Sequence, residues 1–397
     1  MRADQFTQSW DWNIPIPIRY GPGRVREVAS ICAAWGLSNP LIMTDRASAS
    51  LPFVAAVQQA LTDSGLKVGL FTDVSPNPTD VEAARGAEAF RGGGHDAVIA
   101  LGGGSGMDAG KAVSLLATTG RPLWDFDFDV AAPEGLTRAE FPPLICIPTT
   151  AGTGAETEST AMITDTRRGI KGCVWHPAQK PIVALLDPEL TVGLPPRLTA
   201  WTGCDALTHA IEAYIVPSAH PMCDGMALEG LRLVAGALPE VLASPQSIEA
   251  RGAMLVGSCL SGIAFLKGLG MVHAISHMVG AEFDTHHGLT NAVLLPPVLR
   301  FNEPMISDKV GPMCAAMGLK GADFESFIAG VERLLDICEI PQGLTDLGVR
   351  AEAAPSLALK ASRDVAAGTN PRKASVDEIE ALILGAMTTT RPRRALQ

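Results

Sequence analysis

The chain has 397 residues, of which 47% are hydrophobic and 18% charged, and its formal net charge is −11. This length suits two domains with sizeable cores, and an acidic balance without a basic run argues against a nucleic-acid-binding protein. No uncharged apolar run approaches the length of a membrane-spanning helix, and the first residues lack the apolar core of a signal peptide. We therefore expect a cytoplasmic protein without a membrane partner.

The first half of the chain alternates short β-like runs with stretches of helical spacing. Such alternation predicts a doubly wound, mostly parallel sheet with helices on its faces. Pro15 and Pro17 place the opening run at a sheet edge, where proline is tolerated. Thr79 is expected to cap the third helix. We expect strands over 14–21, 40–45, 67–74, 96–104, 144–150 and 182–187, and helices over 24–35, 51–65, 79–91 and from the glycines at 102–104 to about 118.

The pattern changes after the pair Pro195 and Pro196. Alternating β-branched runs almost disappear, and long amphipathic stretches take their place, which predicts an all-helical region. We expect helices over 197–215, 222–243, 247–265, 270–282, 288–302, 324–338 and 376–386. The sequence therefore predicts two domains, an α/β dinucleotide-binding domain over 1–193 and an all-helical, metal-binding domain over 194–397.

The eight cysteines are irregularly spaced and include no C-x-x-C pair. In a chain of this length, that spacing argues against a disulfide framework and against a zinc site built from thiolates. We therefore expect reduced thiols, as in a cytoplasmic protein.

A glycine-rich loop, GGGSGMDAGK, begins at Gly102, where a predicted strand ends and a helix begins. Glycines allow the backbone to approach a pyrophosphate, and a helix N-terminus offers free N–H groups to its charge. The loop is not a Walker A motif, because Ser105 and Ala112 stand where that motif needs Gly and Ser or Thr. The alternative interpretation is a tight strand-to-helix turn without a ligand.

Two further strand ends suit a nucleotide. Asp45 closes the run PLIMTD, where a carboxylate can bind a ribose diol and repel a 2′-phosphate; capping of the next turn is the alternative. The segment PTTAGTGAE, over 148–156, is rich in hydroxyls and small residues, which suits contacts to a nucleotide.

Four of the eight histidines fall within residues 273–287. Asp205 and His209 are four positions apart, as are His273 and His277, so a helix places each pair on one face. A carboxylate with imidazoles and no thiolate favours a divalent metal such as Fe²⁺ or Zn²⁺. One carboxylate and three imidazoles would leave room for a substrate oxygen. A single buried histidine is more often a satisfied core residue, but two such pairs and the doublet His286 and His287 favour a metal site.

Together these motifs resemble the iron-dependent (group III) alcohol dehydrogenases. The resemblance covers nearly the whole chain, through SPNPTD at 75–80, GGGSGMDAGK, PTTAGTGAE, DPEL at 187–190, GCDALTHAIEAY at 203–214, GLGMVHAISHMVGAEFDTHHG at 268–288 and NPR at 370–372. It implies the two-domain architecture that this family shares with dehydroquinate synthase. It also implies an NAD(H)-linked enzyme that interconverts a small alcohol and its aldehyde or ketone, as a homodimer or a larger assembly.

The resemblance assigns roles to individual residues. The implied ligands of Fe²⁺, or alternatively Zn²⁺, are Asp205, His209, His273 and His287, and the spacing after His273 selects His287 over His286. His277 matches the non-ligand histidine of the active site, where it could relay a proton. The residues implied to line the NAD site are Asp45, Asn77, Gly102, Gly103, Gly104, Ser105, Asp108, Thr149, Thr150, Thr153 and Lys171.

The chain also departs from the family pattern. Met278 stands where proline is common, and the stretch AFLKGLGMVH is one residue shorter than usual, with Lys267 beside the expected pocket. Lys267 would either face an anionic substrate or, as we favour, point to solvent and cap a helix.

Two alternative functions stay open at this point. One is a lyase like dehydroquinate synthase, against which DALTHAIE and the lack of a basic phosphate-binding cluster argue. The other is a metal-free reductase or binding relative, as the maleylacetate reductases exemplify, against which the intact set of ligands argues.

Overall fold

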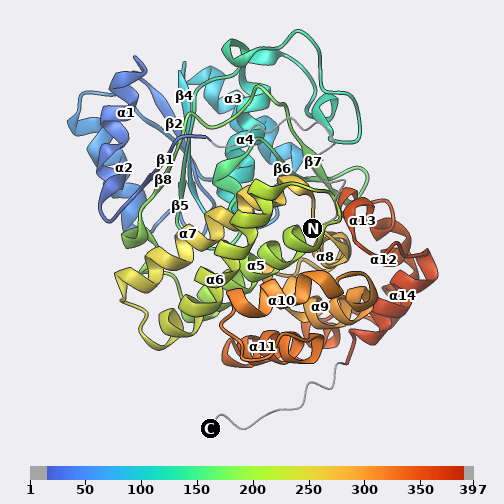
Figure 1. Cartoon of the computed structure of the whole chain (residues 1–397). Coiled ribbons are helices and arrows are strands. Elements are labelled where there is room, and N and C mark those ends of the chain that lie inside the picture. Colours follow the sequence, from blue (N-terminus) through green and yellow to red (C-terminus); the bar gives the residue numbers. More distant parts are fainter. Residues whose placement is uncertain (1–15, 389–397) are drawn as a thin grey trace.

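The computed structural model describes residues 16–388, so residues 14 and 15 of the expected opening strand lie outside the described part. A parallel sheet with helices on both faces forms one half of the molecule, and a helical assembly forms the other (Figure 1). This arrangement confirms the predicted fold class. The last strand of the sheet ends at Leu186 and the first long helix begins at Pro196, while the domain division at residue 193 stays a prediction.

The main sheet has six strands, and all neighbouring pairs are parallel. In spatial order the strands are β1 (Ile18–Tyr20), β8 (Val183–Leu186), β5 (Leu144–Pro148), β4 (Ala97–Gly102), β2 (Pro40–Met43) and β3 (Gly69–Phe71). The opening strand lies at an edge, as its prolines predict. The chain leaves β2 outward to β3 and returns to β4 on the other side of β2. The carboxyl ends of β2 and β4 therefore flank a topological switch point, where such sheets bind ligands.

Side chains of one strand alternate between the two faces of this sheet. Ile99 and Leu101 of β4 pack in one cluster with α1 (Val28–Ala34) and α2 (Pro52–Asp63). Val98 and Ala100 pack in a second cluster with α3 (Asp80–Gly92) and α4 (Gly104–Thr119). Both faces are covered, so the strands are apolar without interruption, as parallel strands usually are. Figure 1 shows the two helix layers on opposite sides of the sheet.

A separate antiparallel hairpin was not predicted from the sequence. It consists of β6 (Ala161–Asp165) and β7 (Ile170–Val174). Its turn is held by Asp165, whose Oδ1 accepts the backbone N–H groups of Arg167 and Arg168 at 2.8 and 2.9 Å. Five-residue strands without strong alternation escape detection by pattern, and a side-chain-capped turn lacks the usual Asn-Gly signature.

The second half is helical, as predicted. Its helices are α5 (Pro196–Ile215), α6 (Pro221–Ala243), α7 (Ile248–Ala264), α8 (Met271–Phe283), α9 (His287–Asn302), α10 (Ser307–Ala316), α11 (Phe324–Ile337), α12 (Ala354–Ala361), α13 (Val365–Thr369) and α14 (Val376–Gly385). Three of them, α10, α12 and α13, were not predicted. They are short, and α10 contains Gly311 and Pro312, which obscure a helical pattern.

Short 3₁₀ helices connect these elements in the described part of the chain. They are η1 (Arg24–Glu27), η2 (Leu123–Phe126), η3 (Arg138–Glu140), η4 (Ala155–Thr157), η5 (Pro188–Thr191), η6 (Phe265–Lys267), η7 (Glu303–Met305), η8 (Leu344–Leu347) and η9 (Ala351–Ala353).

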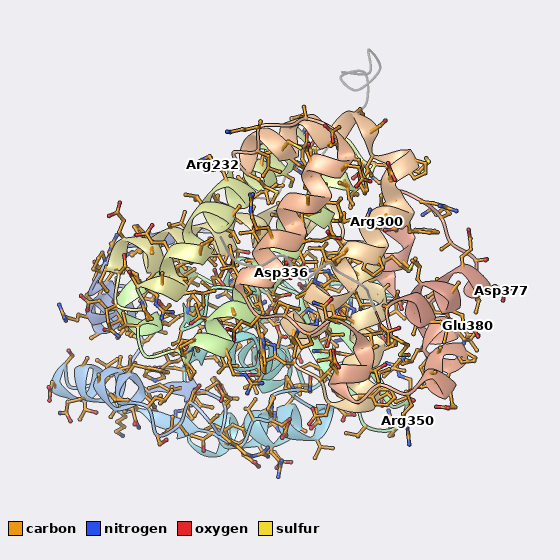
Figure 2. All side chains as sticks on the ribbon, turned by 90° about the horizontal axis from the view of Figure 1, so that it is seen from below. Arg232, Arg300, Asp336, Arg350, Asp377 and Glu380 are labelled. Atoms are coloured by element: carbon orange, nitrogen blue, oxygen red, sulfur yellow. The ribbon has the colours of Figure 1, made fainter. Side chains whose placement is uncertain are left out.

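The helical half has one large apolar core, and its buried charged side chains include Asp205, Glu212, Arg251 and Lys267. Arg232, Arg350 and Asp377 are exposed at the periphery of the helices (Figure 2). One described segment, Ile248–Lys267, is long and apolar enough to cross a membrane, but 67% of its apolar window is buried inside the protein. It includes α7, which packs against α5 and α6 as a core helix does.

Candidate metal and dinucleotide site

Three helices bring one carboxylate and three imidazoles together. Asp205 and His209 lie one turn apart on α5, His273 lies in the first turn of α8, and His287 begins α9. One potential ligand atom from each residue lies within 4.8 Å of those of the others. Asp205 Oδ1 is 3.6 Å from His287 Nε2 and 4.0 Å from His209 Nε2. These are the four residues that the resemblance selected, and His286 is outside the group.

The protonation of these groups fits a cation. Burial lowers the pKa of His209 to about 4, and burial also lowers the pKa of His287 well below its usual range. Both imidazoles are therefore neutral at neutral pH, and each keeps a nitrogen lone pair for a metal. A set of one oxygen and three nitrogen donors suits Fe²⁺ or Zn²⁺, so the residues present fit the ion that the sequence predicts.

Two polar residues that sequence reasoning did not single out contact three of these four. The amide Nδ2 of Asn291, one turn after His287, lies 2.7 Å from Asp205 Oδ1 and 3.1 Å from Nε2 of both His273 and His287. On the far side of His273, the carboxylate of Glu212 lies 2.6 Å from Nδ1. Glu212 follows His209 by three positions on α5, so the helical spacing could have indicated it.

His277 lies beside these ligands with its own partner. Its ring is 5.5 Å from that of His287 and 5.8 Å from that of His273, centroid to centroid. Its Nδ1 is 2.9 Å from Oδ2 of Asp364, the residue that caps α13. An ionised carboxylate only accepts, so Nδ1 donates and the other nitrogen, Nε2, keeps its lone pair. The structure thus places His277 beside His273 and His287 and shows Asp364 as its partner.

A cavity adjoins this pair. It lies between the β6–β7 hairpin and helices α8, α12 and α13, and has a volume of about 210 Å³. Its walls include Asp364 and Met278, the neighbour of His277, together with Lys171 of the hairpin. This places a small cavity, lined by both charged and apolar side chains, between the α/β half and the helical half.

The glycine loop lies at the switch point of the sheet, next to the segment after β5. The N–H of Thr149 donates to Gly102 O at 2.9 Å. A Cβ on Gly103 would lie 3.4 Å from Thr150, and one on Gly104 would lie 2.7 Å from Thr153. Gly104 and Ser105 belong to the first turn of α4, so the unpaired N–H groups of that turn face the loop.

Asp45 caps the following turn and keeps its second oxygen directed toward the glycine loop. Its Oδ1 accepts the N–H groups of Ala47 and Ser48 at 3.0 and 2.9 Å, which caps the following turn. Its Oδ2 lies 3.4 Å from the position that a Cβ on Gly102 would take. The neighbouring Thr44 has a fully buried hydroxyl without a hydrogen-bond partner, 3.5 Å from the same position. A glycine cradle with an unpartnered hydroxyl and a carboxylate at its rim fits the ribose and pyrophosphate of a dinucleotide.

Asn77 and Lys171 form a second group, which links the two halves of the molecule. Lys171 Nζ lies 3.3 Å from Asn77 Oδ1, and Asn77 Nδ2 donates to Asp284 Oδ1 at 2.7 Å. Burial lowers the pKa of Lys171, and burial raises the pKa of Asp108, which lies near it on α4. Asp284 ends α8 with a φ of 52°, so the helical half holds this carboxylate in the left-handed region.

The structure corrects the expectation for Lys267. Its side chain is 1% exposed, forms an ion pair with Asp224 and donates to Tyr214 O. It does not point to solvent, and its polar contacts are with Asp224 and Tyr214 rather than with the four clustered residues. The ammonium faces α6, where the carboxylate of Asp224 neutralises it. His286, the other residue without an assigned role, packs its ring 5.0 Å from that of Trp201.

Comparisons with known proteins agree with this geometry. Models of the iron-containing alcohol dehydrogenases match residues 15–188, and models of the C-terminal part of the Fe-containing alcohol dehydrogenase family match residues 199–387. An NAD-dependent methanol dehydrogenase of Bacillus methanolicus is 36% identical over 383 residues, which are 94% of this chain and 99% of that protein. A lactaldehyde reductase of Escherichia coli (strain K12) is 36% identical over 91% of this chain and 95% of its own length.

Solved structures share the whole fold. The crystal structure of a 1,3-propanediol oxidoreductase superimposes with a TM-score of 0.90 at 34% identity, and the match covers 96% of this chain and all of that one. The two matched family segments together span both halves of the molecule, including the glycine loop and the four clustered residues. The chain therefore belongs to the iron-containing alcohol dehydrogenase family.

Proposed function

We propose that this protein is an NAD(H)-linked alcohol dehydrogenase that interconverts a small alcohol and its aldehyde or ketone with the help of Fe²⁺, or alternatively Zn²⁺. The observation that carries the proposal is the meeting of one carboxylate and three imidazoles from three helices in a buried group. Relatives named for the NAD-dependent dehydrogenation of methanol and for the reduction of lactaldehyde support the reaction class. Family membership weighs against the lyase alternative, and the four converging ligands weigh against a metal-free reductase.

We assign the metal to Asp205, His209, His273 and His287. A bound Fe²⁺ ion would supply Lewis acidity toward the alcohol or carbonyl oxygen. The protein's own contribution is the neutral state of its buried imidazoles and the exclusion of water, since Asp205, His209 and His273 are each less than 5% exposed. Such a dry, preorganised site strengthens electrostatic interactions with the reacting oxygen.

We assign the dinucleotide to the switch point of the sheet. NAD, when bound, supplies the hydride acceptor. The N–H groups at the start of α4 would hold the pyrophosphate between the glycines and the threonines of the 149–153 segment, and Asp45 Oδ2 would accept from a ribose hydroxyl. On the hairpin side, Lys171 and Asn77 would contact the end of the cofactor nearest the metal ligands.

We assign the proton relay to His277. Its Nδ1 donates to Asp364, so Nε2 is the nitrogen that can take a proton from the alcohol. Asp364 then stabilises the resulting imidazolium, and it also lines the cavity of about 210 Å³, through which the proton would leave.

The test is a survey of alcohols with NAD⁺ on protein loaded with Fe²⁺ without oxygen. Neutral primary alcohols, diols and hydroxy acids of matched chain length should be compared. We expect turnover with small neutral alcohols, because Lys267 is neutralised by Asp224 and offers no free cation to an anionic substrate. Absence of NAD⁺ reduction with every alcohol would contradict the proposal.

We also propose a homodimer or larger assembly in the cytoplasm. The 18% charged fraction and the edge position of β1, which leaves one side without a partner among the described residues, support an assembly. None of the eight cysteines forms a disulfide, which suits a reducing compartment. Sedimentation at micromolar concentration tests the assembly, and a monomer would contradict it.

A further inference from the structure

Glu212 lies behind a metal ligand rather than among the ligands. It shares one face of α5 with Asp205 and His209, and its side chain is 1% exposed. Oε2 lies 2.6 Å from His273 Nδ1, and Oε1 accepts the backbone N–H of Val272 at 2.9 Å. A Cβ on Gly270 would come within 2.6 Å of Oε1, so glycine at this position lets the carboxylate reach the start of α8.

The partners of His273 on both sides agree on one tautomer. An ionised carboxylate only accepts hydrogen bonds, so His273 Nδ1 carries the proton that is shared with Glu212. With that proton on Nδ1, Nε2 holds the lone pair, and it lies 3.1 Å from the amide Nδ2 of Asn291, a group that only donates. The same amide group of Asn291 also lies close to Asp205 and His287, so Nε2 is on the side of His273 that faces these two residues. His209 has a weaker partner, since its Nδ1 lies 3.3 Å from the carbonyl oxygen of Gly152.

We propose that Glu212 is a positioning residue of the metal centre, which fixes the tautomer and the ring orientation of His273. This inference rests on the proposed function, because it concerns the same metal. Carboxylates behind metal-binding imidazoles orient the ring and raise its basicity. Here the same carboxylate also accepts a backbone N–H in the first turn of α8. One side chain therefore positions both the start of this helix and the imidazole ring of His273.

The proposal demands two accepting oxygens at residue 212. Glutamine has nearly the same shape but offers one carbonyl oxygen and one NH₂ group. If the glutamine oxygen accepts the N–H of Val272, the glutamine NH₂ group faces His273 Nδ1. Nδ1 must then accept, so the ring proton moves to Nε2, where the lone pair is needed to bind the metal. If the oxygen takes Nδ1–H instead, the NH₂ group faces the N–H of Val272, and the start of α8 loses its acceptor.

The experiment is a Co²⁺ titration of the metal-free, full-length protein and of Glu212→Gln, followed by the visible spectrum of bound Co²⁺ and by competition with a chelating dye. We expect Glu212→Gln to bind Co²⁺ roughly 10- to 100-fold more weakly than the wild type. The control is Asn370→Ala, which removes the acceptor of the neighbouring Met271 N–H but touches no imidazole. It should lower the unfolding midpoint and leave the affinity of the folded protein for Co²⁺ unchanged.

Wild-type affinity in Glu212→Gln would overturn the proposal and leave Glu212 as a helix cap. An equal loss of affinity in Asn370→Ala would overturn it as well, because the effect would then follow the helix start alone. If the glutamine variant does not fold, Glu212→Asp decides: its shorter carboxylate cannot reach both donors, so weaker Co²⁺ binding is expected and wild-type binding contradicts the proposal. Absence of Co²⁺ binding by the wild type would instead contradict the proposed function.

Discussion

At the level of single residues, the two oxygens of Asp45 have different surroundings. Oδ1 accepts hydrogen bonds from the backbone of the next turn, whereas Oδ2 faces Gly102, the first glycine of the glycine-rich loop. A 2′-phosphate on the ribose would meet this second oxygen as a like charge in a partly desolvated place. We therefore predict that this carboxylate favours NAD over NADP.

We predict that Asp45→Gly raises the kcat/KM ratio of NADP⁺ to NAD⁺ by about tenfold or more, which corresponds to about 1.4 kcal/mol. Initial rates with both cofactors measure it. The role of Asp45 is refuted if the wild type uses NADP⁺ as well as NAD⁺.

Lys267 is a second residue whose role the structure changes. Its ammonium is buried against Asp224, which also has Lys309 at 3.8 Å, and its polar contacts are not with the four clustered residues. Replacing Lys267 by Met should lower the free energy of unfolding by roughly 1–3 kcal/mol, because Asp224 loses its nearest cation while staying partly hydrated. The KM values for an anionic and a neutral aldehyde of equal length should change alike. A selective rise in KM for the anionic aldehyde would return Lys267 to the substrate pocket.

At the level of elements, the segment over 148–156 is held in place by a contact between two backbones, one at Gly154 and one at Gly262. Gly154, with a φ of 62°, lies against Gly262 of α7, and a Cβ on Gly262 would come within 2.5 Å of Gly154 O. Both sides of this contact are backbone atoms, which cannot move aside as the end of a flexible side chain could. The approach of these two glycines therefore sets the position of Thr153 and of the helical turn η4.

We predict that Gly262→Ala lowers the free energy of unfolding by about 1–3 kcal/mol and raises KM for NAD⁺, because the 153–157 segment must move. The matched control is Gly236→Ala on the neighbouring helix α6, where an added Cβ meets nothing within 4 Å. This control should stabilise the protein by about 0.5–1 kcal/mol and leave KM unchanged. Thermal unfolding and NAD⁺ kinetics of both variants decide; equal KM values would contradict the account of the contact.

Local signals explain which elements could be predicted. Helix α3 has a capping box, in which Thr79 accepts from the N–H of Glu82 and Glu82 accepts from the N–H of Thr79, and both residues stand in the sequence at the expected spacing. The β6–β7 hairpin has no comparable local signal. Its turn depends on the side chain of Asp165, and its packing on distant segments such as η2, so its strands could be found only in the structure.

At the level of the whole molecule, some residues of the site could be predicted from local sequence patterns and others could not. Asp205 and His209 could be paired from the sequence because four positions on a helix share a face. The choice of His287 over His286 came from the family pattern. The partners Glu212 with His273 and Asp364 with His277 are 61 and 87 positions apart. Contacts between helices at such separations follow no periodicity, so only the folded chain brings them together.

The whole molecule is also organised around the space between its halves. The carboxyl ends of β2 and β4 face the helical half, whose helices α5, α8 and α9 supply the four residues to which we assign the metal. Asn77 reaches across to Asp284, and the carbonyl of Gly152 reaches His209. The segments that we propose to bind the nucleotide thus contact the helices that we propose to bind the metal, as a reaction between two bound partners requires.

The most direct test of the central claim is the metal content of protein purified without oxygen, together with its alcohol-dependent reduction of NAD⁺. We predict about one Fe²⁺ or Zn²⁺ per chain in the wild type, held by Asp205, His209, His273 and His287. His273→Ala should lose the metal and turnover together. His286→Ala is the matched control: its ring packs on Trp201 outside the four ligands, so metal and activity should persist. Full metal occupancy in His273→Ala would contradict the account.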